Sequence, residues 1–258
     1  IPELSQNAGP VYGRIGDKPI ILWYDVIVTF GEYREVRKGY FTIMNRMTDY
    51  LTAMISDKKK RRILFWSILG MAVLLRCIRF AEVPDGINQD EAMGAMDAWA
   101  LSKYGTDRYG TFLPVHFTAW KYSQMSVLLS YCMIPFIKIF GFHTITVRLP
   151  MLILSSGAVA LVYLVGRELF DDRIGMVAML LTAVNPWQFM QSRWSLDCNL
   201  FPHIFLLAFY LLLLGLKKRR YLYVSMPFFG LTFYCYGVAA YSVTAFLYSS
   251  CGVCGSDG

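Results

Sequence analysis

Long apolar blocks separated by short charged segments are the main feature of this chain. The first block, residues 63–80, is long enough to cross a hydrocarbon core of about 30 Å, because a helix rises about 1.5 Å per residue. The pattern recurs, and the predicted membrane spans cover residues 63–80, 147–166, 174–190, 200–216 and 221–236, with a sixth that begins near 241. The sequence therefore predicts an all-α membrane protein, a polytopic bundle of transmembrane helices.

The charged segments between the blocks set the orientation of the spans. Basic residues at 58–62 precede the first span, and by the positive-inside rule they place its start in the cytoplasm. Segment 122–141 is apolar but is interrupted by Pro135 and Lys138. If it crossed the membrane, the basic loop 166–173 would lie outside, so we predict a helix in the outer interface instead. The outer loops are then 81–146, 187–199 and about 236–241.

Composition agrees with a membrane protein. Hydrophobic residues make up 56% of the 258 residues and the mean hydropathy is +0.42, whereas soluble domains average about 45–50% apolar residues. The formal net charge is +7, but the basic residues stand beside apolar blocks and not among exposed aromatic residues, so nucleic acid is not an expected partner. Cys251 and Cys254 have the spacing of a redox or zinc pair, but no second pair or histidine accompanies them, and no metal site is predicted.

The two ends of the chain differ from the apolar blocks. Residues 1–57 form an unassigned cytoplasmic extension, a small mixed segment in which 19–30 is predicted as strand and 31–56 as a strand followed by an amphipathic helix. Residues 58–250 form the predicted membrane domain, and 251–258 are an atypical tail. Because the chain begins with Ile and ends within an apolar pattern, we expect an N-terminal piece of a longer protein.

A cluster of carboxylates opens the first outer loop, where the sequence Asn88-Gln-Asp90-Glu91 begins a predicted helix. Asn88 can cap this helix, and Glu91, three residues later, can complete a capping box. Acidic residues in a first helical turn also complement the helix dipole. A carboxylate at the membrane surface can equally act as a general base that takes a proton from an acceptor hydroxyl. In that interpretation Asp90 is the base, and Glu91 orients it or binds a cation.

The later part of the first outer loop and the other two loops add charged and aromatic candidates. Arg193 and Asp197 are four residues apart, so on one helix they would be neighbours. They form either a surface ion pair or a site in which Arg193 binds phosphate and Asp197 joins the catalytic pocket. Tyr236 fits an interfacial aromatic belt or a surface that stacks on a sugar or isoprenoid. Trp120 and Lys121 are further candidates for substrate binding, and Lys121 is suited to a phosphate.

The order and spacing of these segments resemble the polytopic GT-C glycosyltransferases, in particular the protein O-mannosyltransferases and the lipid A aminoarabinose transferase. The matching pieces, which cover roughly residues 63–249, are Pro84 to Glu91, "PFIKIFGFHTITVRLP" (135–150), "GRELFDDR" (166–173), "NPWQFMQSRWSLDCN" (185–199) and "YGVAAYS" (236–242). The resemblance implies a multi-pass enzyme of the plasma (inner) membrane and cell envelope, surrounded by membrane lipids. Such an enzyme moves a sugar from a polyprenyl-phosphate carrier to a glycan, lipid or protein acceptor on the outer face, with inversion.

Carried onto this sequence, the resemblance implies that Asp90 is the base or its close partner and that Asp197 is the second-loop acid. It also makes Arg193 and Lys121 the candidate ligands of the carrier phosphate. Relatives that bind a divalent metal often have an acid before a Lys-Pro pair in the first loop, and "TAWKYSQ" (118–124) has neither feature, which counts against metal dependence. A divalent cation is the one candidate cofactor that the resemblance leaves open. Two other functions fit the chain: a transporter or flippase of lipid-linked sugars, and an inactive fragment or scaffold.

Overall fold

A computed structural model describes residues 52–120 and 122–255 of the chain. The chain divides into two units, Ile1–Met54 and Ile55–Gly258, and the second unit carries the fold described below. The predicted strands at 19–30 and most of the segment predicted at 31–56 lie outside the described residues, as does the mixed character predicted for the N-terminal extension.

The described part of the chain is almost entirely helical. The helices in chain order are α2 (Lys58–Cys77), α3 (Gln89–Tyr104), α4 (Leu128–Phe140), α5 (Thr144–Leu169), α6 (Asp172–Val184), α7 (Pro186–Gln191), α8 (Asp197–Lys217), α9 (Arg219–Thr232) and α10 (Ala239–Gly255). The described residues form one short antiparallel hairpin of β1 (Phe117–Ala119) and β2 (Ser123–Met125), in which Thr118 lies opposite Gln124, and an isolated bridge pairs Thr106 with Phe112. The prediction of an all-α membrane protein is confirmed.

Two of these helices are long and apolar enough to cross a membrane, α5 with 26 residues and α8 with 21. The single span predicted at 174–190 is wrong, because the chain forms two helices there. α6 ends at Asn185, whose side chain accepts hydrogen bonds from the backbone N–H groups of Trp187 and Gln188 and so begins α7. Pro186 stands at the first position of α7, where its missing N–H costs least.

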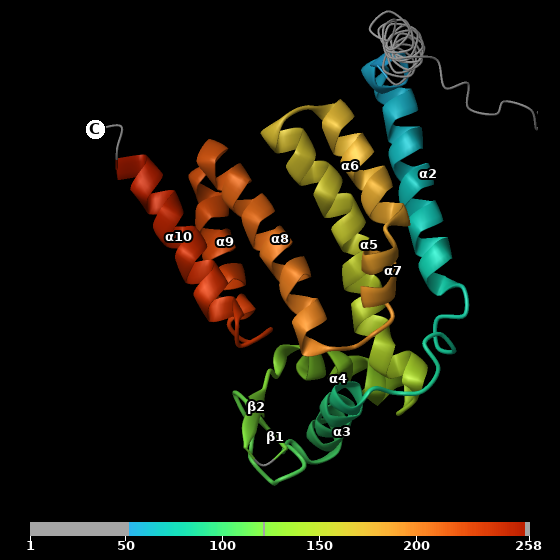
Figure 1. Cartoon of the computed structure of the whole chain (residues 1–258), viewed down its shortest axis with the longest axis vertical. Helices are drawn as coiled ribbons and strands as arrows, with labels where there is room; N and C mark the ends of the chain where they lie inside the picture. Colours follow the sequence, from blue (N-terminus) through green and yellow to red (C-terminus); the bar gives the residue numbers. More distant parts are fainter. Residues whose placement is uncertain (1–51, 121, 256–258) are drawn as a thin grey trace, which may run out of the picture. The chain divides into compact units, whose positions relative to one another are not determined.

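Segment 122–141 contains a short helix at the end of the bundle, in keeping with the prediction that it does not form a full span. Its helix α4 has 13 residues and a length of about 20 Å, which is short of a hydrocarbon core. Figure 1 shows α3, α4 and the hairpin gathered at one end of the long helices α5 and α8. Buried side chains join α3, α4, α5 and α8 into one core, among them Ala95, Ala98, Leu129, Met133, Met151 and Leu200. The hairpin packs in a second cluster with Leu101 and Val127.

Small residues let neighbouring helices approach closely. A Cβ atom added to Gly175 of α6 would lie 2.7 Å from the backbone oxygen of Tyr163 in α5, and one added to Gly166 would lie 2.8 Å from the Cα of Gly175. Gly215 of α8 makes a similar approach to Leu222 of α9. Close backbone packing of this kind is typical of helices that associate within a membrane. There the hydrophobic effect does not drive association, and small residues allow the close van der Waals packing that does.

Candidate functional site

The three predicted outer loops meet at the end of the bundle that carries α3 and α4. The backbone N–H of Ser126 lies 3.4 Å from the carboxylate of Asp197, and this contact links the first loop to the second. The backbone N–H of Leu128 donates to the carbonyl of Tyr234 at 3.2 Å, and the ring of His116 stacks on that of Tyr234 with centroids 6.4 Å apart. The first loop is therefore also in contact with the segment that leads from α9 into the third loop.

Asp90 and Asp197 are the two predicted acids that the fold brings together. Asp90 is exposed in the first turn of α3, where the side chain of Asn88 caps the helix by accepting from the Asp90 N–H at 3.0 Å. Asp197 is partly buried in the first turn of α8, and its carboxylate accepts from the Cys198 N–H at 2.7 Å. Burial raises the pKa of Asp197, and the negative charge of Asp90 raises it further. An exposed acid in the first turn of α3 and a partly buried acid in the first turn of α8 thus influence each other through their charges.

Glu91 has a different environment from its neighbour Asp90. Its side chain is fully buried, and its carboxylate accepts from Arg148 Nε at 2.8 Å and from Arg148 Nη2 at 3.0 Å. The backbone N–H of Ser195 also donates to Glu91, at 3.2 Å. The capping box predicted from Glu91 is wrong, because the carboxylate turns inward to this ion pair and away from the end of its own helix.

Arg148 is a residue of this region whose role the sequence interpretation missed. It lies in α5 with its side chain fully buried, and it donates to the backbone carbonyls of Pro84 at 3.1 Å and Gly86 at 2.6 Å as well as to Glu91. It therefore holds the segment before α3 against the start of α5. The sequence does contain a sign of this role, because Arg148 stands at the start of a long apolar run. Burying a charge beside such a run costs free energy unless the charge has partners, so a buried partner was to be expected.

Arg193 does not pair with Asp197, and the two residues do not share a helix. Arg193 is 2% exposed and precedes α8, and its guanidinium lies over the ring of Phe189 with 4.2 Å to the centroid. Its Nη atoms donate to backbone carbonyls at and beyond the end of α2, namely those of Leu75, Ile78, Arg79 and Val83. Burial lowers the pKa of Arg193, and the nearby charge of Arg148 lowers it further. The predicted neighbour relationship with Asp197 is wrong, because α8 begins only at Asp197 itself.

The aromatic candidates lie at the surface of the same end. Trp120, in the turn between β1 and β2, is 55% exposed and has a φ of 51°. Tyr236, in the third loop, is 37% exposed. Lys121 lies outside the described residues. Both rings are accessible to a ligand, as a stacking role would require.

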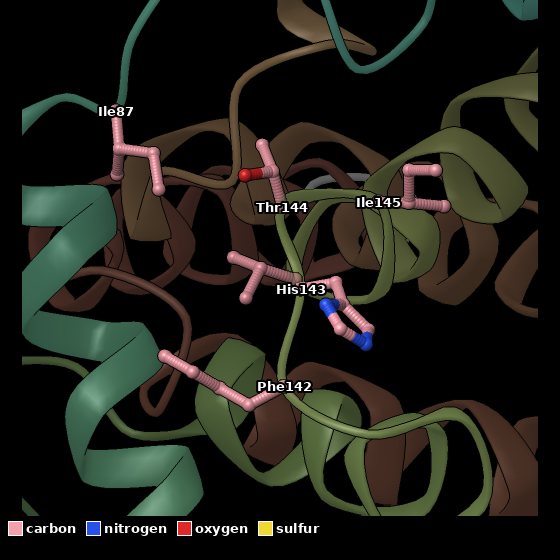
Figure 2. Close-up of a pocket in the computed structure, with 6 residues that line it drawn as sticks. Ile87, Phe142, His143, Thr144 and Ile145 are labelled. Atoms are coloured by element: carbon pink, nitrogen blue, oxygen red, sulfur yellow. The ribbon is translucent and has the colours of Figure 1, made fainter.

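An apolar pocket lies between the chain segment before α3 and the start of α5. Figure 2 shows Ile87 on one side of it and the turn that carries Phe142, His143 and Thr144 on the other. Its volume is about 540 Å³, and Ile145 and Val147 complete its lining. Among the described residues, no group of three or more His, Cys, Asp or Glu side chains is arranged to hold a metal ion.

Comparison with known proteins gives one match. Residues 125–251 match the model of a family described as dolichyl-phosphate-mannose-protein mannosyltransferase. No curated protein and no solved structure matches the chain. The matched region runs from the end of β2 through most of α10 and includes Arg148, Arg193 and Asp197, while Asp90 precedes it. The match confirms the resemblance seen in the sequence and supports a GT-C-like mannosyltransferase fragment over residues 125–251.

Proposed function

We propose that this glycosyltransferase moves a sugar from a polyprenyl-phosphate carrier to an acceptor hydroxyl on the outer face of the membrane, with inversion at the anomeric carbon. The family match supports a GT-C-type glycosyltransferase that uses a lipid-linked sugar. The observation that carries the finer proposal is the convergence of Asp90 and Asp197 from two loops that the charge pattern assigns to the outer face.

In the proposed reaction Asp90 is the general base. Its exposed carboxylate takes the proton of the acceptor hydroxyl while the acceptor oxygen forms a bond to the anomeric carbon. The bond between that carbon and the carrier oxygen breaks in the same displacement, and the carrier phosphate leaves with the electron pair. The charge of Asp197 lies close to Asp90, and it would favour the positive charge that develops on the sugar ring in the transition state.

The other candidates are divided between substrate contact and positioning. Trp120 and Tyr236 present accessible rings for a sugar or an isoprenoid chain, and Lys121 stays our candidate for the carrier phosphate. For Arg193 and Glu91 we propose a positioning role. The guanidinium of Arg193 already donates to backbone carbonyls, and the carboxylate of Glu91 already accepts from Arg148.

The test measures sugar transfer in membranes that carry the full chain, with mannosyl polyprenyl phosphate as the donor and endogenous membrane acceptors. We expect Asp90→Asn to lower transfer by about 10²–10⁴-fold at equal protein level, since this is the usual contribution of a general base. Asp197→Asn should also lower transfer. Asp85→Asn removes another exposed acid of the first loop and should leave transfer unchanged.

Two outcomes would contradict the proposal. Full transfer by Asp90→Asn would reduce Asp90 to an acid of the first helical turn and move the search for a base to Asp197. Movement of the lipid-linked sugar across the membrane by the wild type, without any transfer, would favour the transporter interpretation.

A further inference from the structure

A second pocket lies at the opposite end of the bundle, and the proposed transfer site does not use it. Its volume is about 240 Å³, and it is formed by the first turns of α2 and the last turns of α5. Arg148, near the transfer site, and Arg167, in this pocket, lie on the same helix α5 about 30 Å apart along its axis. That separation equals the thickness of a hydrocarbon core, so the pocket falls at the headgroup level of the other leaflet.

The rim of this pocket is strongly cationic. Lys58, Arg61, Arg62 and Arg167 all line it. Arg61 is held in place, because its Nη1 lies 2.7 Å from the carboxylate of Asp172. The guanidinium of Arg167 lies 5.7 Å from the centroid of the Tyr163 ring and forms a 3.5 Å ion pair with Glu168.

Two of the cations lack an acidic partner in the part of the chain that the structure describes. Lys58 and Arg62 are exposed, and neither forms an ion pair with any residue that the structure describes. Both stand in the first turns of α2, near the end that carries the positive-inside signal. An arginine and a lysine on one rim offer the donors that phosphate oxygens accept.

The inner wall of the pocket is apolar and aromatic. Phe65 and Tyr163 pack against each other with ring centroids 5.1 Å apart, and Leu164 lies beside them. The Tyr163 hydroxyl donates to Asp172 at 2.7 Å, which fixes the ring that forms this wall. A free phosphate ion would gain nothing from such a surface, whereas the glycerol and first acyl carbons of a phospholipid would pack on it.

We propose that this pocket binds the headgroup of an anionic phospholipid in the cytoplasmic leaflet. Lys58 and Arg62 contact the phosphate oxygens, Arg61 and Arg167 add positive field, and Phe65 and Leu164 contact the upper part of the acyl chain. Basic pockets between membrane helices on the cytoplasmic side are suited to such headgroups. The site lies away from the acids of the proposed transfer reaction, and a failure of that reaction would not affect it.

The test uses the purified full chain in detergent, with native mass spectrometry to count bound lipids. The probes are short-chain phosphatidylglycerol, phosphatidylcholine with the same acyl chains, and inorganic phosphate. The double variant Lys58→Gln/Arg62→Gln should weaken phosphatidylglycerol binding by about tenfold or more, given the usual contribution of a basic residue near a lipid surface.

The chain offers a matched control in Lys59→Gln/Lys60→Gln, which removes the same charge from the same helical turn but from residues that do not line the pocket. This control should bind phosphatidylglycerol within about twofold of the wild type, and phosphatidylcholine should bind weakly to all three proteins. Equal losses in the two double variants would contradict the proposal, because they would indicate a diffuse attraction. Equal binding of the two lipids would contradict it as well. Displacement of the lipid by inorganic phosphate at the same concentration would assign the pocket to a soluble anion.

Discussion

Glu91 and Arg148 form a two-point ion pair, with 2.8 Å between Oε1 and Nε and 3.0 Å between Oε2 and Nη2, and both side chains are fully buried. Glu91 also accepts from the Ser195 N–H, so the pair joins α3 and α5 to the loop before α8. Asp90 is the residue before Glu91 and Asp197 begins α8 just after Ser195. The ion pair therefore fixes the two segments that carry the proposed catalytic acids.

Loss of the Glu91 charge should destabilise the protein strongly. Glu91→Gln leaves the buried guanidinium of Arg148 without a counter-charge, and breaking a buried ion pair from one side costs about 3–5 kcal/mol. Thermal or denaturant unfolding of the full chain in detergent measures the change. Glu82→Gln is the control, because Glu82 pairs with Arg79 at the surface and exposed pairs contribute about 1 kcal/mol or less. Similar effects of the two substitutions would show that the Glu91 pair is solvated.

Substitution of Arg193 separates positioning from phosphate binding. Arg193→Lys replaces a planar fork by a single ammonium group, so several carbonyls at and beyond the end of α2 lose their donor. We expect a loss of about 1–3 kcal/mol in the free energy of unfolding, while the KM for the lipid-linked donor stays within about twofold. Arg173→Lys changes an exposed arginine of α6 and should alter neither quantity. A donor KM that rises tenfold or more with unchanged stability would assign Arg193 to the phosphate after all.

Cysteine reactivity tests the packing of the segment between α9 and the third loop on the first loop. Cys235 is fully buried, in one cluster with Ala95 of α3 and Leu129 of α4. Because a fully buried thiol is out of reach of the reagent, iodoacetamide should leave Cys235 unmodified in the native protein at pH 8 and react with it only after unfolding. Cys77 is exposed and serves as the internal reference in peptide mapping. Equal labelling of both residues at pH 8 would mean that this segment does not pack as described.

The sequence predicted the helical membrane class, because that class depends on features readable along the chain. Apolar block length marks the two clear spans α5 and α8, and alternating loop charge assigns the loops to faces. The break at Asn185-Pro186 was missed because the surrounding residues are apolar enough to be taken as one block. The side-chain cap of Asn185 ends α6 and begins α7, although the hydropathy of the segment favours one continuous helix.

The roles of the charged side chains were harder to predict than their positions. Glu91 suited a capping box, yet its carboxylate binds Arg148, which is far away in the sequence. Arg193 suited a phosphate, yet its guanidinium binds backbone carbonyls near the end of α2. In both cases a distant partner satisfies the charge, and a pattern of local spacing holds no information about such a partner.

The contact between α5 and α6 gives a last prediction, with a control at another glycine of α5. Gly175→Ala places a methyl group 2.7 Å from the Tyr163 carbonyl oxygen, which is closer than real Cβ contacts allow, so the two helices must separate. We expect a loss of about 1–3 kcal/mol in unfolding free energy, as for other overpacked sites. Gly157→Ala in α5 meets no atom within 4 Å and should be neutral or raise stability by up to about 1 kcal/mol, because alanine favours helix over glycine. If both substitutions stabilise the protein, α5 and α6 do not make the close contact described here.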